Sequence, residues 1–269
     1  MAATEQFQDF VPVDEWPTVA TMLEGFGDQT LPASTALAGT TVSLHAEDGR
    51  EFRFVFHDGS SLAWTTAGTG ADQEVDASYK AIEARNGIFI IDIIHGENRA
   101  MQHTTIVFNR NTGVATIAVS RFVDEDGRTR AATEFIHAKT ESAAGGLHQR
   151  SSGLVGKRIY YRYSDVESYE HIYLNPGTFV WHCIRGGEKG LADVERSMVF
   201  DIDQDLFLFF WTEKVMTVEA VLLVDLREQR SIGRMFGWDD STDAPVVLPF
   251  NSRLSVLNTT GYPQDHNKH

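Results

Sequence analysis

The chain has 269 residues, of which 42% are hydrophobic and 11% aromatic, so it can form one large domain or two small ones with real cores. Its formal net charge of −15 argues against nucleic acid, which requires a basic face, and disfavours anionic membranes. The single cysteine allows no disulfide within the chain, the start shows no signal-peptide pattern, and no stretch approaches the roughly 20 apolar residues of a membrane span, so we expect a cytoplasmic protein without a membrane partner.

The first expected element is a helix in an N-terminal extension of residues 1–36. Asp14 is the expected cap and Pro17 suits the first turn. The apolar residues that recur at helical spacing are Val19, Met22, Leu23 and Phe26.

From residue 37 the pattern is that of short strands separated by turn sequences such as HDGS (57–60) and NRNTG (109–113). Strands are expected at 52–56, 61–66, 76–84, 88–94, 103–109, 114–122, 128–138, 157–164, 169–174, 178–184, 197–202, 206–213, 219–225 and 230–236. This all-β pattern predicts two tandem lipocalin-like antiparallel β-barrels with a short N-terminal helix. The first barrel is expected at 37–139, a polar linker at 140–152, the second barrel at 153–255 and a polar tail at 256–269.

An internal repeat supports the two barrels. Residues 154–181 repeat residues 37–64 without a gap, at an offset of 117 positions (154 − 37). The shared positions are Leu37, Gly39, Asp48 and Trp64, which fall on Leu154, Gly156, Asp165 and Trp181. The copies differ in polar content, because Leu44, Ala46 and Phe54 correspond to Tyr161, Tyr163 and His171. The second barrel is therefore the expected ligand site, and the first is expected to be filled and structural.

Period-two alternation predicts which side chains point into the second barrel. The polar members of this inward set, and our candidate catalytic residues, are Glu213, Tyr161, Tyr163 and His171. The candidate ligand-binding residues are Tyr169, Tyr173, Phe179, Trp181, Phe207, Phe209 and Trp211. A few convergent polar groups among apolar walls are the usual form of a small-molecule site.

Each candidate also has an alternative interpretation. A tyrosine at a barrel end often only points its hydroxyl at water, and His171 could be a structural histidine whose hydrogen bonds are satisfied. Glu213 follows an apolar run, so desolvation should raise its pKa toward an acid/base range, unless it lies at the rim and pairs with Lys214 or Arg162. The histidines show no metal-ligand spacing, so no metal is expected.

Two strings carry a family resemblance: IYYRYSDVESYEHIYLN from Ile159 and FLFFWTEK from Phe207. With the later run through Asp225, Arg230, Gly233 and Arg234, they resemble the MoaF-like family. The resemblance extends over about residues 37–240 and implies two lipocalin-like, or calycin-like, domains. The family is named after a molybdenum cofactor biosynthesis protein, but the matching residues include none that would bind molybdopterin.

The second half also resembles phenolic acid decarboxylases more distantly. These are single cofactor-free barrels with a Tyr-x-Tyr and a later Trp-Thr-Glu, which the resemblance places at Tyr161, Tyr163 and Glu213. It implies that the tyrosines bind a substrate carboxylate and the glutamate moves a proton. Gly190 stands where those enzymes have an arginine, and Arg185 or Lys189 would have to replace it.

Two functions remain open at this point. The favoured one is a cofactor-independent lyase, isomerase or decarboxylase that acts on a small aromatic or terpenoid-like molecule, with Glu213 as general acid/base. The alternative is a non-catalytic binding protein for a small hydrophobic or aromatic ligand. The sequence leaves the oligomeric state open, a homodimer included.

Overall fold

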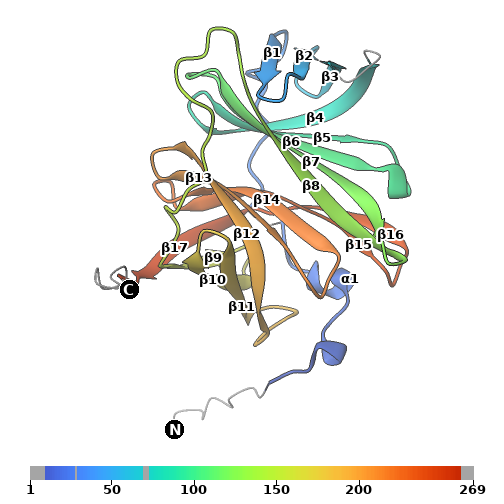
Figure 1. Cartoon of the computed structure of the whole chain (residues 1–269). Coiled ribbons are helices and arrows are strands. Elements are labelled where there is room, and N and C mark those ends of the chain that lie inside the picture. Colours follow the sequence, from blue (N-terminus) through green and yellow to red (C-terminus); the bar gives the residue numbers. More distant parts are fainter. Residues whose placement is uncertain (1–9, 28, 69–72, 262–269) are drawn as a thin grey trace, which may run out of the picture.

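The computed structural model describes residues 10–27, 29–68 and 73–261, and nearly all of its regular structure is β-strand (Figure 1). Two antiparallel β-barrels follow one another along the chain and pack against each other, the first above the second in Figure 1. The fold class predicted from the period-two patterns is confirmed.

The first barrel is a ring in which each strand pairs with the next. Its strands are β1 Thr41–Ala46, β2 Glu51–Phe56, β3 Ser61–Ala67, β4 Gln73–Arg85, β5 Ile88–His95, β6 Gln102–Asn109, β7 Val114–Glu125 and β8 Arg128–Lys139, with a short 3-10 turn η2 at Asn98–Ala100. Only two residue pairs join β8 back to β1. Apolar side chains fill the interior: the buried Phe54 ring stacks on Phe52 and Trp64 at centroid distances of 6.3 and 5.8 Å. A groove of about 810 Å³ lies beside residues 41–43 of β1, which pair with β2 but not with β8. Its lining includes Val42 but none of these three rings.

The second barrel has one strand more. Its strands are β9 Lys157–Arg162, β10 Ser168–Asn175, β11 Thr178–Arg185, β12 Ala192–Asp203, β13 Leu206–Thr212, β14 Val218–Asp225, β15 Arg230–Asp239, β16 Ala244–Pro249 and β17 Ser252–Thr259. The pairings β14–β15, β15–β17 and β17–β9 close the ring. Among the described strands, β16 pairs only with β15 and lies outside the ring. β17 continues past residue 255, the predicted end of the barrel, because Val256–Thr259 pair with β9. Residues 262–269 of the predicted tail lie outside the described residues.

The repeat has the same register in both barrels. Phe54 of β2 pairs with Trp64 of β3, and His171 of β10 pairs with Trp181 of β11. A histidine in the second barrel therefore takes the place of a core phenylalanine in the first.

Hydrogen bonds to buried charged groups join the barrels. Arg85 of β4 donates to Asp225 of β14 at 2.6 and 2.8 Å, and Arg234 of β15 pairs with Glu219 at 3.2 Å and donates to Thr105 of β6 at 3.1 Å. The run Asp225–Arg234 noted in the sequence thus contributes to this interface. The predicted linker also packs, since the buried His148 bonds Thr116 at 2.8 Å.

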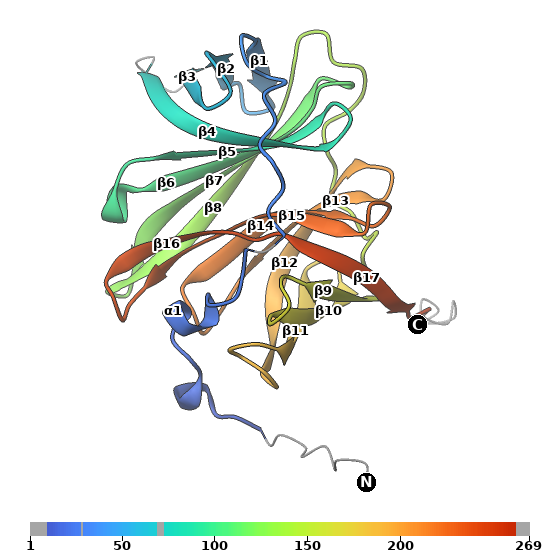
Figure 2. The ribbon, with the colours of Figure 1, turned by 180° about the vertical axis from the view of Figure 1, so that it is seen from behind.

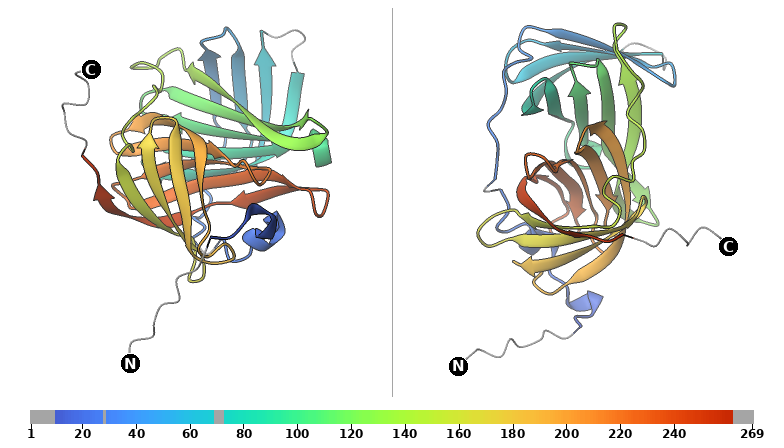
Figure 3. Two further views of the ribbon diagram at one scale, coloured as in Figure 1. Left: turned by 60° about the horizontal axis from the view of Figure 1, so that its bottom comes forward. Right: turned by 90° about the vertical axis from the view of Figure 1, so that its left-hand side faces the viewer.

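The N-terminal segment departs most from expectation. Instead of one longer helix capped by Asp14, it forms a 3-10 turn η1 at Val13–Glu15 and a single helical turn α1 at Val19–Met22, which Thr18 caps by accepting from the backbone N–H of Thr21. Although it precedes the first barrel in sequence, this segment lies on the second, and the chain then runs up to β1 (Figures 2 and 3). No helix among the described residues is long and apolar enough to cross a membrane.

Candidate functional site

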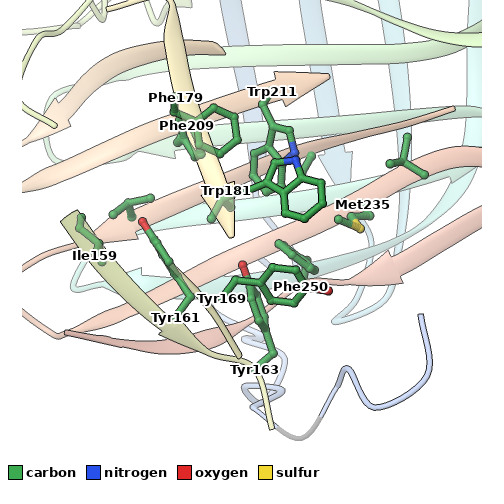
Figure 4. Packing of buried hydrophobic residues seen from close by; sticks show 14 of the residues in the cluster. Ile159, Tyr161, Tyr163, Tyr169, Phe179, Trp181, Phe209, Trp211, Met235 and Phe250 are labelled. Carbon is green, nitrogen blue, oxygen red and sulfur yellow. The ribbon is translucent and has the colours of Figure 1, made fainter. Parts of the chain in front are cut away.

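The aromatic faces predicted to point inward form the core of the second barrel (Figure 4). The residues that line its remaining cavity include six from the predicted set, namely Tyr163, Tyr169, His171, Trp181, Trp211 and Glu213. Tyr161, Tyr173, Phe179 and Phe209 belong to the same core but do not line the cavity. Phe207 packs close to Gly153, away from this cavity.

The tyrosine hydroxyls are buried and do not face water. Tyr161 and Tyr163 have no exposed surface, and the Tyr161 hydroxyl lies 2.7 Å from that of Tyr173. The Tyr163 hydroxyl has no hydrogen-bond partner in the described part of the chain. Burial raises the pKa of both Tyr161 and Tyr163, so both remain neutral donors at physiological pH.

His171 is a buried neutral imidazole. Its ring lies 4.4 Å from the Tyr161 ring and 5.6 Å from the Trp211 ring, and its Nδ1 is 3.4 Å from the Tyr173 hydroxyl. Burial lowers the pKa of His171 to about 3. Such an imidazole is a weak base near neutral pH, and it can contribute hydrogen bonding and shape.

Glu213 follows β13 and faces the cavity, and no lysine or arginine among the described residues pairs with it. The two candidate partners are engaged elsewhere: Lys214 pairs with Asp193 at 2.8 Å, and Arg162 pairs with Asp165 at 2.7 Å. Burial, with the nearby carboxylates of Glu188 and Glu195, raises the pKa of Glu213 well above its ordinary value. The sequence predicts this direction.

The sequence patterns do not indicate three further carboxyl groups, of which Glu188 and Glu195 lie near Glu213 and Glu167 lies near Glu188. Glu167, Glu188 and Glu195 are all buried, and burial is the main cause that raises the pKa of each to about 7. Glu188 also lines the cavity and accepts a hydrogen bond of 2.8 Å from the Tyr169 hydroxyl.

The positions of these glutamates explain why they were missed. Glu188 lies in the glycine-rich GGEKG loop between β11 and β12, where no strand period predicts the direction of a side chain. Glu195 pairs across strands with Phe179, so its inward direction follows from alternation, but the strand was expected to begin at 197. A strand that begins at residue 192, as β12 does, predicts an inward direction for Glu195.

The N-terminal segment closes the open end of this barrel. The Phe26 ring packs 5.0 Å from Tyr163 and 5.2 Å from Phe250, and Trp16 meets Trp181 edge-on at 5.7 Å. The space left between these rings and the carboxyl groups is about 20 Å³, room for about one water molecule. The described interior is therefore closed, and a ligand can bind only after Phe26 and its neighbours move.

The cavity lining contains no lysine or arginine among the described residues. Arg185 is exposed and donates to the carbonyl oxygen of Asp165 at 3.0 Å, and Lys189 is also exposed. Neither replaces the arginine of the decarboxylases. No group of three or more His, Cys, Asp or Glu side chains in the described ranges is arranged to hold a metal ion.

Two family models match the chain, one in each half. The MoaF N-terminal domain family matches residues 14–124, and the MoaF C-terminal domain family matches residues 148–260. Protein MoaF of Klebsiella aerogenes is 30% identical over 262 residues, which covers 91% of this chain and 97% of that protein. A solved structure described as "Crystal Structure of a putative beta-lactamase from Burkholderia vietnamiensis" aligns with a TM-score of 0.34 and 17% identity, over 40% of this chain and all of that one.

Proposed function

The chain belongs to the MoaF family, and we propose that it is a cofactor-independent acid/base enzyme of lyase or isomerase type, acting on a small aromatic or terpenoid-like molecule in the second barrel. One observation carries this proposal. Two carboxyl groups with raised pKa, Glu188 and Glu213, line the same aromatic cavity. Acid/base catalysis is most efficient when the pKa of the group lies near the working pH.

The two glutamates are suited to different roles. Because the pKa of Glu188 is about 7, a large fraction of it is ionised at neutral pH and can accept a proton. The pKa of Glu213 is raised well above its ordinary value, so Glu213 is the better donor. Pairs of carboxyl groups whose environments separate their pKa values commonly divide acid and base roles in this way. The unpartnered Tyr163 hydroxyl would orient the substrate.

Charge restricts the substrate class. A carboxylate substrate would meet the partly ionised Glu188, with no lysine or arginine in the described lining to offset its charge. We therefore favour a substrate without a free carboxylate, and a lyase or isomerase reaction over decarboxylation. The aromatic walls of Trp181 and Trp211 fit a flat apolar body.

The proposal requires the N-terminal segment to open. Residues 10–27 cover the mouth of the barrel, and Phe26 occupies the space beside Tyr163 and Phe250. Opening exposes Glu188 and Glu213 to the substrate, and closure then excludes water from the reacting groups.

The test begins with native mass spectrometry of the purified protein, to identify any bound molecule. Turnover of that molecule is then compared in the wild type, in Glu213→Gln and in Glu141→Gln, a matched change at an exposed glutamate. We expect Glu213→Gln to lower turnover by at least about a hundredfold with little loss of binding, and Glu141→Gln to leave it unchanged. Near-normal turnover in Glu213→Gln would remove Glu213 from the mechanism.

The second candidate function is a non-catalytic binding protein. The density of aromatic rings around Trp181 and Trp211 favours it, because a carrier needs only shape and apolar walls. Binding of the identified molecule with unchanged affinity in Glu213→Gln, and no turnover in either form, would establish the carrier.

A further inference from the structure

We propose that a second small-molecule site lies between the two barrels, outside both interiors, and that it binds small apolar phenols or alcohols. The site is the cleft formed by β4, β5 and β6 of the first barrel and by β15, β16 and the following turn of the second. Its lining residues are Ser78, Tyr79, Lys80, Ile82, Asp92, Ile94, His103, Gly233, Arg234, Val247, Pro249 and Asn251.

The size of the cleft supports a ligand. Its volume is about 300 Å³, compared with about 20 Å³ inside the second barrel. Sites for small molecules begin at roughly this size. Apolar walls come from Ile82 and Ile94 on one barrel and from Val247 and Pro249 on the other. The side chain of Ile94 is 40% exposed and therefore accessible from the cleft.

The floor of the cleft is a fixed polar network. Asp92 accepts hydrogen bonds from Thr105 at 2.7 Å and from His103 Nε2 at 3.1 Å, and Thr105 accepts from Arg234 at 3.1 Å. Although burial raises the pKa of Asp92, the bonds from His103 and Thr105 outweigh it and keep the pKa below its usual value. An ionised carboxylate with a 21% exposed side chain therefore faces an apolar cleft.

Two buried polar atoms of the lining have no partner among the described residues. They are Nδ1 of His103 and Nδ2 of Asn251, and both side chains are about 2% exposed. With Nε2 donating to Asp92, His103 Nδ1 is an acceptor, while Asn251 Nδ2 is a donor. Unpaired buried groups are rare and costly, so the polar floor beneath the cleft has unused donor and acceptor capacity.

Charge points to a neutral head group. Lys80 lies directly across the strand pair from Asp92, so the cleft presents a cation beside an anion, and a simple ion of either sign would meet a like charge. The positive charge of Arg234 is balanced by Glu219 at 3.2 Å. A hydroxyl fits this pair, because it can donate to Asp92 and accept from Lys80. Its apolar body would then pack between Ile94 and Val247.

The experiment uses two probes that differ only in the hydroxyl group, whose hydrogen is replaced by a methyl group in the second probe. The probes are 4-propylphenol and its methyl ether, 4-propylanisole, which can accept a hydrogen bond but cannot donate one. Binding is followed by isoleucine methyl NMR on the full-length protein. Ile82 and Ile94 report on the cleft, and Ile159 reports on the interior of the second barrel. We expect the phenol to shift Ile82 and Ile94 saturably and the ether to bind at least about tenfold more weakly, the factor that corresponds to one lost hydrogen bond.

Three variants complete the test. Ile94→Trp fills the cleft from a half-exposed position and should abolish the shift of Ile82, while Lys80→Met should weaken phenol binding by about tenfold. Lys139→Met, at an exposed lysine on β8, is the matched control and should bind as the wild type does. Shifts confined to Ile159, equal affinity for phenol and ether, or unchanged binding in Ile94→Trp would each overturn the proposal.

Discussion

Replacement of Glu188 by glutamine should make the protein more stable at high pH and leave it unchanged at low pH. The pKa of Glu188 rises from 4.5 to about 7 on folding, chiefly through burial. Because the folded pKa is the higher one, the folded state binds the proton more tightly. The contribution of the protonated Glu188 to the stability of the folded state is therefore fully present below pH 4.5. It is lost as the pH rises through the folded pKa of about 7. The span of 7 − 4.5 corresponds to about 3 kcal/mol at 1.36 kcal/mol per pKa unit.

The glutamine retains an oxygen that can accept from Tyr169, as Glu188 does at 2.8 Å. Urea unfolding of the wild type and of Glu188→Gln should therefore agree near pH 4, and at pH 8 the variant should be more stable by about 3 kcal/mol. Glu141→Gln, at an exposed position, controls for the loss of one negative charge. Parallel curves for the wild type and Glu188→Gln across this range would refute the reasoning, because the carboxyl group would then titrate alike in both states.

Three further outcomes are expected. Phe26→Ala removes the ring that fills the mouth of the second barrel, so the affinity for toluene should rise by at least about tenfold when binding is measured by tryptophan fluorescence. Phe10→Ala, at an 88% exposed phenylalanine, is the control and should have no effect. Phe54→Ala, in the core of the first barrel, should lower the free energy of unfolding by about 3–5 kcal/mol in urea titrations, and a loss below about 1 kcal/mol would mean that this core is not packed as described. Trp181→Phe and Trp211→Phe should each reduce the fluorescence response to a ligand of the second barrel, and a full response in both would place the ligand elsewhere.

Local patterns predicted the barrels well, because one alternating face of each strand must be buried. The faces through Tyr161, His171 and Trp181 all lie in the core of the second barrel, as alternation requires. The internal repeat also predicted where the two interiors differ in polarity, since Phe54 lies in the apolar core of the first barrel and its counterpart His171 in the core of the second. The elevated pKa of Glu213 followed from its place after an apolar run.

Side chains outside regular strands could not be placed in this way. Loop residues have no period, so nothing in the sequence directs Glu188 from its GGEKG loop toward Tyr169. The helical spacing around Phe26 was visible, but the surface that this segment covers depends on packing between positions far apart in the chain.

The amino-acid sequence by itself determined the two barrels, their repeat and the inward aromatic faces, because strand period and burial are local properties of a chain in water. Only the tertiary structure decided that Phe26 closes the second barrel, that Glu188 joins Glu213 there, and that Asp92 and Arg234 meet between the barrels. These contacts join segments far apart in sequence. They depend on how two complete surfaces fit together and on which charged groups lose water when the surfaces meet. No short stretch of the chain encodes either property.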